Sequence, residues 1–234
     1  MNKASIKSVL TAFSGALAIT SAAELDQPED VIEDCTKLSD ISFVVFDTET
    51  TGWGKDTGRV IEIGCVKFIN GQAAARKSWL INPGLPITRD SQRVHGISDE
   101  MVKDCPLFKE VYPKFTAFTK GSILMAHNAS FDIGFIANEV ERNELELPNN
   151  IVLDTLRLSR KWFPDLKSHS LSKMVIELNI PSGQMHRGLA DAECTKEVVL
   201  MGFEKMGKEA CFKDLTELAG KKYTFKQKRR RKKN

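Results

Sequence analysis

The stretch that decides the fold is ISFVVFDTETTG, residues 41–52. Its first six residues are nearly all apolar and β-branched or aromatic, which is typical of a strand buried on both faces. Asp47 and Glu49 follow at once. Residues i and i+2 of an extended chain point to the same side, so both carboxylates are expected to face one point. Such a pair repels unless a cation lies between its members, and oxygen ligands suit Mg²⁺ or Mn²⁺ better than zinc.

The pattern downstream predicts a mixed sheet. Residues 59–68 and 73–81 flank an Asn70-Gly71 turn and are expected to form a hairpin. A short apolar strand is expected at 123–126, and another strand before the last helices. The fold class is therefore α/β: an antiparallel meander followed by strand–helix alternation, flanked by helices. Helices are expected to begin near 98 and 106 and to span about 130–143, 154–162, 170–179 and 188–207.

Two later segments carry further candidates. Asp132 ends HNASFD at a strand-to-helix junction, where it could also be a first-turn acid stabilised by the helix dipole. His186 and Asp191 lie in HRGLADAE, in which Gly188 allows a turn. The histidine is expected in a loop and the aspartate in the first turn of the last helix. Taken alone, each segment is better explained by ordinary structural roles.

Taken together and in this order, the three segments resemble the DEDD exonuclease superfamily, in its histidine branch. FDTETTG, HNASFD and HRGLADAE match its three motifs. The resemblance covers about residues 42–200 and is nearest to the epsilon-type proofreading exonuclease of bacterial replicative DNA polymerase. It implies a ribonuclease H-like sheet. The connecting signals also match in order: Asn82-Pro83, VHGISDEM at 94–101, Asp154-Thr155-Leu156 and His169-Ser170-Leu171.

The resemblance implies roles for particular residues. Asp47, Glu49 and Asp191 would hold one divalent cation, Mg²⁺ or Mn²⁺. Asp47 would bridge to a second cation, with Asp132 contributing directly or through water. His186 would be the general base, and all five positions carry the expected residue. The implied substrate contacts at the terminal nucleotide are Thr48, Thr50, His95, Asn128 and Phe131.

Some aromatic side chains have ordinary structural roles as alternatives. Phe131 could stack on a base or could be a core aromatic, and His95 could line the pocket or be a structural histidine. His127 and His169 are expected to be structural hydrogen-bonding residues rather than catalysts.

The function implied is a metal-dependent 3′–5′ exonuclease that hydrolyses single-stranded or mismatched DNA 3′ ends to 5′-mononucleotides. Proofreading beside a DNA polymerase catalytic subunit is the implied setting. A standalone exonuclease that trims DNA or RNA, similar to ribonuclease T, is the alternative. A non-catalytic adaptor for a polymerase or nucleic acid is another, and the intact ligand set argues against it. The N-terminal extension and the lack of a convincing clamp-binding peptide put replisome membership in doubt.

Charge and composition suggest three parts. Residues 1–40 form an extension, with a signal-like segment at 1–23 and an acidic linker at 24–40; residues 41–207 form the exonuclease domain; residues 208–234 form a tail. The last 14 residues hold nine Lys or Arg and no acid, which leaves 25 bases against 31 acids elsewhere. The polybasic segment at 221–233 suits nucleic acid or is simply solvated. The acidic body argues against a broad positive groove.

The five cysteines are odd in number, scattered and free of CxxC pairs, so neither a disulfide framework nor a zinc site is expected. A reducing, cytoplasmic location fits them, and export is the alternative if residues 1–23 are a cleaved signal. No uncharged apolar run reaches the ~18 residues that cross a bilayer, so no membrane partner is expected.

Overall fold

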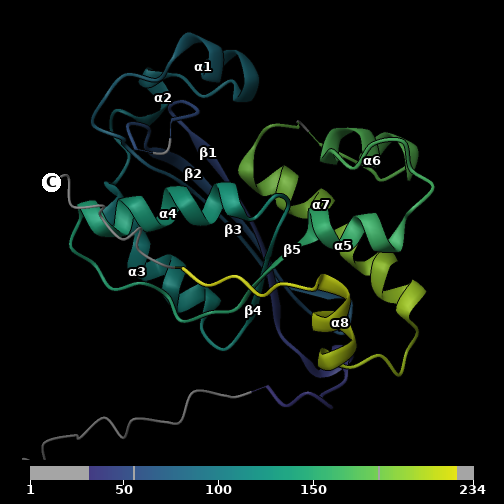
Figure 1. Ribbon diagram of the computed structural model, residues 1–234. Helices are drawn as coiled ribbons and strands as arrows, with labels where there is room; N and C mark the ends of the chain where they lie inside the picture. Colours follow the sequence, from purple (N-terminus) through teal and green to yellow (C-terminus); the bar gives the residue numbers. More distant parts are fainter. Residues whose placement is uncertain (1–31, 55, 184, 226–234) are drawn as a thin grey trace, which may run out of the picture.

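The computed structural model describes residues 32–54, 56–183 and 185–225. A five-stranded sheet in the order β3-β2-β1-β4-β5 lies at its centre (Figure 1). The β1–β2 and β2–β3 pairs are antiparallel, whereas β1–β4 and β4–β5 are parallel. The expected α/β class with a mixed sheet is confirmed. The strands are β1 Phe43–Thr50, β2 Val60–Ile69, β3 Gln72–Leu80, β4 Ile123–Ala126 and β5 Val152–Asp154.

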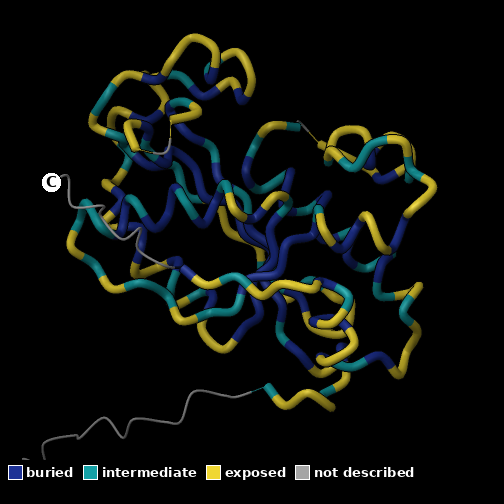
Figure 2. Tube along the Cα trace, viewed as in Figure 1, coloured by how far each residue is buried: buried dark blue, intermediate teal, exposed yellow. Residues whose placement is uncertain are grey.

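Strand β1 is central and is buried on both faces, as its apolar run predicts (Figure 2). Phe43 and Val45 belong to one core cluster, and Val44 and Phe46 belong to the cluster on the opposite face. The strand continues to Thr50, beyond the apolar run, because its pairing with β2 extends that far. Asp47 and Glu49 therefore lie within the strand, where successive side chains point to opposite faces of the sheet.

Helices cover both faces of the sheet (Figure 1). The cluster containing Val44 also holds side chains of α3 and α4, and the cluster containing Phe43 holds side chains of α5, α6, α7 and α8. The short helices α1 and α2 lie beyond the end of β1 and β2, where a small apolar cluster joins Val102 of α2 to Ile61 of β2. The bounds are η1 Leu38–Asp40 (a 3-10 helix), α1 Arg89–His95, α2 Asp99–Val102, α3 Phe108–Thr119, α4 Ser130–Arg142, α5 Thr155–Trp162, α6 Leu171–Glu177, α7 Gly188–Met206 and α8 Phe212–Ala219.

Parts of the two terminal segments pack against this domain. The Leu38 N–H donates to the Ala210 carbonyl at 3.0 Å, and Val152 of β5 exchanges two 2.9 Å backbone hydrogen bonds with Tyr223. Phe225 is buried in the α3–α4 cluster. The described parts of residues 1–40 and 208–234 thus contact the core directly.

The three-part division of the chain remains a prediction. The signal-like segment 1–23 and the basic residues from 226 onward lie outside the described residues. Within the described ranges, no helix is both long and apolar enough to cross a membrane.

Candidate active site

Three carboxylates from two elements converge at the carboxyl end of β1. Asp47 and Glu49 of β1 and Asp191 of α7 offer ligand oxygens that all lie within 4.8 Å of one another. The alternation of β1 explains this, because odd-numbered residues of the strand face the side covered by α7. The predicted convergence of the first and third motifs is therefore present in the fold.

The fourth carboxylate reaches the same strand from the opposite face. Asp132, in the first turn of α4, is 2% exposed. It accepts hydrogen bonds from the Thr48 N–H at 3.0 Å and from Thr48 Oγ1 at 2.7 Å. Thr48 points to this face because it alternates with Asp47 and Glu49. Asp132 is thus fixed beside the cluster without belonging to its closest group.

Two glycines bring α7 onto the sheet. A Cβ atom on Gly64 of β2 would lie 2.0 Å from the carbonyl carbon of Gly188, the first residue of α7. A Cβ atom on Gly188 would lie 3.2 Å from the Asp47 carbonyl oxygen. The start of α7 therefore rests on the backbones of β2 and β1, and this close approach delivers Asp191 to the cluster.

A buried ion pair holds the loop that precedes α7. Glu62 of β2 is 1% exposed and accepts hydrogen bonds from Arg187 Nε at 3.0 Å and Nη2 at 3.1 Å. It also accepts from the Gly188 N–H at 3.1 Å and from Ser78 Oγ at 2.7 Å. Burial raises the Glu62 pKa, but these donors outweigh it and hold the pKa below its usual value. Glu62 pairs across the sheet with Glu49, so the anchor is next to the site.

Burial and mutual repulsion make it costly for all the carboxylates of the cluster to be ionised unless a cation is bound. Burial, then the charges of Asp132, Glu49 and Asp191, raise the Asp47 pKa well above its usual value. Burial, followed by Asp191, raises the pKa of Glu49 to about 8. Burial also raises the Asp191 pKa, although the His186 N–H lowers it in part. Carboxylate oxygens crowded in this way suit hard divalent cations, which supply the missing positive charge.

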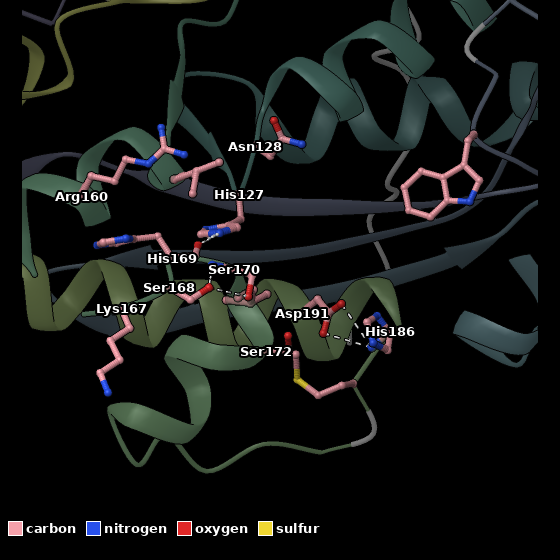
Figure 3. A pocket seen from close by; sticks show the side chains of 14 residues that line it. His127, Asn128, Arg160, Lys167, Ser168, His169, Ser170, Ser172, His186 and Asp191 are labelled. Atoms are coloured by element: carbon pink, nitrogen blue, oxygen red, sulfur yellow. Dashed lines mark hydrogen bonds between the residues drawn. The ribbon is translucent and has the colours of Figure 1, made fainter.

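His186 lies in the loop between α6 and α7, beside Asp191 (Figure 3). Its N–H donates to both carboxylate oxygens of Asp191 at 3.2 Å. Its backbone is left-handed, with φ 62°, and the residue is exposed. The hydrogen bonds therefore fix the loop backbone while the imidazole remains accessible to solvent.

A cavity of about 720 Å³ opens beside this histidine. Asn128 lies on its wall, with φ 65° and its N–H donating to Asp154 Oδ1 at 3.1 Å. Trp53 also lines the cavity, is 74% exposed and contacts Phe131 edge to face at 6.1 Å between ring centroids. The cavity is lined by Trp53, His127, Asn128, Leu156, Arg160, Lys167, Ser168, His169, Ser170, Leu171, Ser172, Met185, His186 and Asp191 (Figure 3).

The predicted substrate contacts divide into two groups. Asn128 lines the cavity. Phe131 does not line it but packs against Trp53, which does. Thr48 and Thr50 are instead buried, and the Thr50 hydroxyl donates to the Gly52 carbonyl at 3.0 Å. The hydrogen bonds of these two threonines are made within the protein, Thr48 to Asp132 and Thr50 to Gly52.

His95, the last residue of α1, is buried, and both of its ring nitrogens make hydrogen bonds. Its Nδ1 accepts from the Ile97 N–H at 3.0 Å, which leaves Nε2 to donate to the Thr50 carbonyl at 3.2 Å. Burial lowers the His95 pKa, in keeping with a neutral ring. This geometry matches the structural alternative for His95.

His127 and His169 are also hydrogen-bonded within the protein. His127 contacts Thr155 Oγ1 at 3.1 Å and the His169 carbonyl at 2.8 Å, and His169 Nε2 contacts the Phe163 carbonyl at 3.0 Å. Together they join the loop before α4 to the loop before α6. The structural role expected for both matches these contacts.

Two residues that the sequence did not single out belong to the site. Glu62 could have been noticed as an acid within an otherwise apolar strand segment, where burial requires a partner. Trp53 directly follows the first motif, and a tryptophan at a turn is a candidate exposed aromatic. The partner of each residue became visible only in the fold.

The chain is similar to known exonucleases and to DNA polymerases III of the PolC type. The RNase_T family model, described as exonuclease, matches residues 44–199. A PolC-type DNA polymerase III from Caldanaerobacter subterraneus subsp. tengcongensis is 40% identical over 176 residues, covering 75% of this chain and 12% of the polymerase. A solved structure of exonuclease X in complex with 5′ overhanging duplex DNA is 27% identical, with a TM-score of 0.61, covering 76% of this chain and 99% of that one.

A more distant structure shares the fold alone. E. coli exonuclease I in complex with a dT13 oligonucleotide is 15% identical, with a TM-score of 0.63, covering 72% of this chain and 42% of that one. The match to the exonuclease model and the fold both agree with the resemblance to DEDD exonucleases drawn from the motifs.

Proposed function

This chain belongs to the exonuclease family, and from that premise we propose that it removes nucleotides from the 3′ ends of single-stranded DNA with the help of divalent cations. The observation that carries the proposal is the convergence of Asp47, Glu49 and Asp191 within 4.8 Å. A cluster of carboxylates with raised pKa values next to an accessible imidazole is suited to metal-assisted phosphodiester hydrolysis.

The donor set suits two Mg²⁺ or Mn²⁺ ions. Asp47, Glu49 and Asp191 would hold one ion, and Asp47 and Asp132 would hold the second. The chemistry that bound ions would supply here is activation of water and neutralisation of charge on the attacking and leaving oxygens.

The side chains of the protein supply the remaining functions. The His186 imidazole would accept the proton from the attacking water at a ring nitrogen, since imidazole is the commonest general base near neutral pH. Asn128 and Trp53 would orient the terminal nucleotide in the cavity, with Phe131 supporting Trp53. Breaking the bond between phosphorus and the 3′ oxygen would release a 5′-mononucleotide.

Similarity to PolC-type polymerases supports proofreading as the setting. The chain spans only 12% of the length of the first such relative, so the polymerase activity that the relative's name gives is not proposed for this chain. We propose that this chain edits mismatched 3′ ends next to a polymerase catalytic subunit. Standalone trimming of DNA or RNA ends is the second candidate, and the cytoplasm is the proposed location for either.

A degradation assay tests the proposed activity. The purified chain should shorten a 5′-labelled single strand from its 3′ end in Mg²⁺ or Mn²⁺ and leave it intact in EDTA. The variant Asp47→Ala should lose nearly all of this activity. Intact substrate with wild-type protein in every metal would reject catalysis and leave the adaptor alternative.

A second comparison tests the setting. Matched, mismatched and RNA 3′ ends should be degraded at different rates, with the mismatched DNA end fastest when a cognate polymerase is present. Equal rates on DNA and RNA, unaffected by polymerase, would favour the standalone trimming enzyme.

A further inference from the structure

The cavity beside the metal ligands extends well away from them. At one end are His186 and Asp191, and at the other are Arg160 at the end of α5 and Lys167 in the following loop (Figure 3). Between them the wall carries the hydroxyl groups of Ser168, Ser170 and Ser172. One end of the cavity is therefore acidic, the other end is basic, and the serine hydroxyl groups between them can donate hydrogen bonds.

A second cavity continues from the basic end. It has a volume of about 470 Å³ and lies between α5 and the end of α8. Arg160 lines both cavities, and Arg157 and Lys161 line the second. Its single acidic lining residue is Glu217. Lys221 and Lys222 follow in sequence directly after the Gly220 that closes its lining.

Arg160, Lys161 and Lys167 are available for a ligand. Arg157 Nε donates to the Ala219 carbonyl at 3.2 Å, so only the rest of its guanidinium can contact one. Helix α5 buries Leu158 and Trp162 in the core, which turns Arg157, Arg160 and Lys161 outward. Among the described residues, no ion pair joins Arg160, Lys161 or Lys167 to a carboxylate. Exposed cations that are not paired with a carboxylate are suited to binding an external anion.

We propose that these two cavities form one track for the substrate strand, which crosses α5 with its phosphates on Arg160 and Lys167 and then on Arg157 and Lys161. The 3′ end lies at Asp191, and the strand upstream of it runs toward the end of α8. This proposal rests on the proposed function, because the acidic end of the track is the proposed catalytic cluster.

The charge distribution supports a strand over a compact ligand. Without its last 14 residues the chain holds more acids than bases, so a cavity lined by three basic residues and one acidic residue differs in sign from the body as a whole. A polar track with basic side chains spaced along it follows a phosphodiester backbone without reading its sequence. Lys221 and Lys222, which follow Gly220 in the sequence, continue the series of basic residues just beyond α8.

Substitutions at the first two cations test the track. Arg160→Gln with Lys167→Gln should raise KM for a strand of about ten nucleotides on the order of tenfold, with a much smaller rise for a dinucleotide that cannot reach them. The pair Lys109→Gln with Lys114→Gln on α3 removes the same charge from the opposite face and serves as the matched control. Their KM values should equal those of wild type.

Binding in EDTA separates the track from catalysis. Each lost phosphate contact should reduce the slope of log Kd against log salt by about 0.7 for a single strand, so the Arg160/Lys167 variant should lose about 1.4. A slope and a length dependence identical to those of the α3 control would overturn the track. Failure of the wild-type protein to hydrolyse the p-nitrophenyl ester of thymidine 5′-monophosphate would instead count against the proposed catalytic function.

Discussion

Gly64 of β2 and Gly188 of α7 are in such close contact that a methyl group on Gly64 would come within 2.0 Å of the Gly188 carbonyl carbon. Gly64→Ala must therefore push the start of α7 away from the sheet and carry Asp191 with it. We expect a loss of about 3 kcal/mol in the free energy of unfolding, as in an overpacked core, and a greater than tenfold loss of activity. Urea denaturation and the degradation assay measure the two effects.

Gly183→Ala is the control for this substitution. A Cβ atom there would meet no other atom within 4 Å, so stability and activity should stay at wild-type levels. Wild-type activity in Gly64→Ala would show that the position of α7 is less constrained than its contact with β2 indicates.

His186 can be tested without disturbing its backbone. Its φ of 62° lies in the left-handed region, which asparagine tolerates better than alanine does. His186→Asn should keep the rise in melting temperature caused by Mn²⁺, because the N–H that contacts Asp191 remains, and should lower kcat by about 10²–10⁴-fold. Turnover of His186→Asn at the wild-type rate would contradict the assignment of His186 as the general base.

The raised carboxyl pKa values predict how stability depends on pH without metal. Glu49 keeps its proton in the folded state up to a pH of about 8, well above its ordinary pKa of 4.5. The folded chain thus binds more protons than the unfolded chain in this interval. In EDTA the free energy of unfolding should therefore fall as the pH rises from 5 to 8, by up to about 1.4 kcal/mol per pH unit for each proton.

Glu49→Gln should flatten this pH dependence, and Mg²⁺ should oppose it in the wild type. The cation favours ionised ligands, so its binding should release protons. Isothermal titration calorimetry in buffers of different ionisation enthalpy measures that release. A stability that rises with pH over the same interval would mean that the carboxylates are separated by solvent.

The buried pair between Glu62 and Arg187 should matter for both stability and activity. Glu62→Gln leaves the guanidinium with a neutral partner and weakens the hold on Gly188, at a cost of about 2 kcal/mol in unfolding free energy. kcat should fall because the loop carrying His186 loses its anchor. Adding Arg187→Met should recover part of the stability, because the unpaired charge is then removed.

Exposed Glu217 provides the comparison for Glu62. Glu217→Gln should change the unfolding free energy by less than about 0.5 kcal/mol, as surface substitutions usually do. Equal effects at Glu62 and Glu217 would argue against an anchoring role for the buried carboxylate.

Trp53 is expected to bind substrate without supporting the fold. It is 74% exposed, so Trp53→Ala should leave the melting temperature unchanged. Loss of one base–aromatic stack, about 1–3 kcal/mol, should raise KM for single strands at least fivefold, and Trp53→Phe should restore most of the affinity. An unchanged KM for Trp53→Ala would place the terminal base elsewhere in the cavity.

Much of the architecture could be predicted because β1 and its neighbours have distinct patterns. The apolar run at 41–46 identified the central strand, and the Asn70-Gly71 turn identified the hairpin. Helix α8 was missed, although Phe212 and Leu215 have helical spacing. Its helical state depends on packing against α5 and β5, which local sequence does not report.

The site could be predicted as far as its ligands, and less well in its surroundings. Asp47 and Asp191 are recognisable because their motifs occur in a fixed order along the chain. The contacts of Glu62 with Arg187 and of Trp53 with Phe131 join segments distant in sequence, so no local pattern reveals them. The buried positions of Thr50 and His95 were hidden for the same reason.

The contact between Gly64 and Gly188 also makes the proposed metal site depend on segments that are synthesised far apart in time. The strand that carries Asp47 and Glu49 leaves the ribosome long before Asp191 does. Until α7 packs onto β2, the carboxylate cluster lacks its third member. The proposed metal site is therefore complete only in a chain whose last long helix has been made and has packed on the sheet.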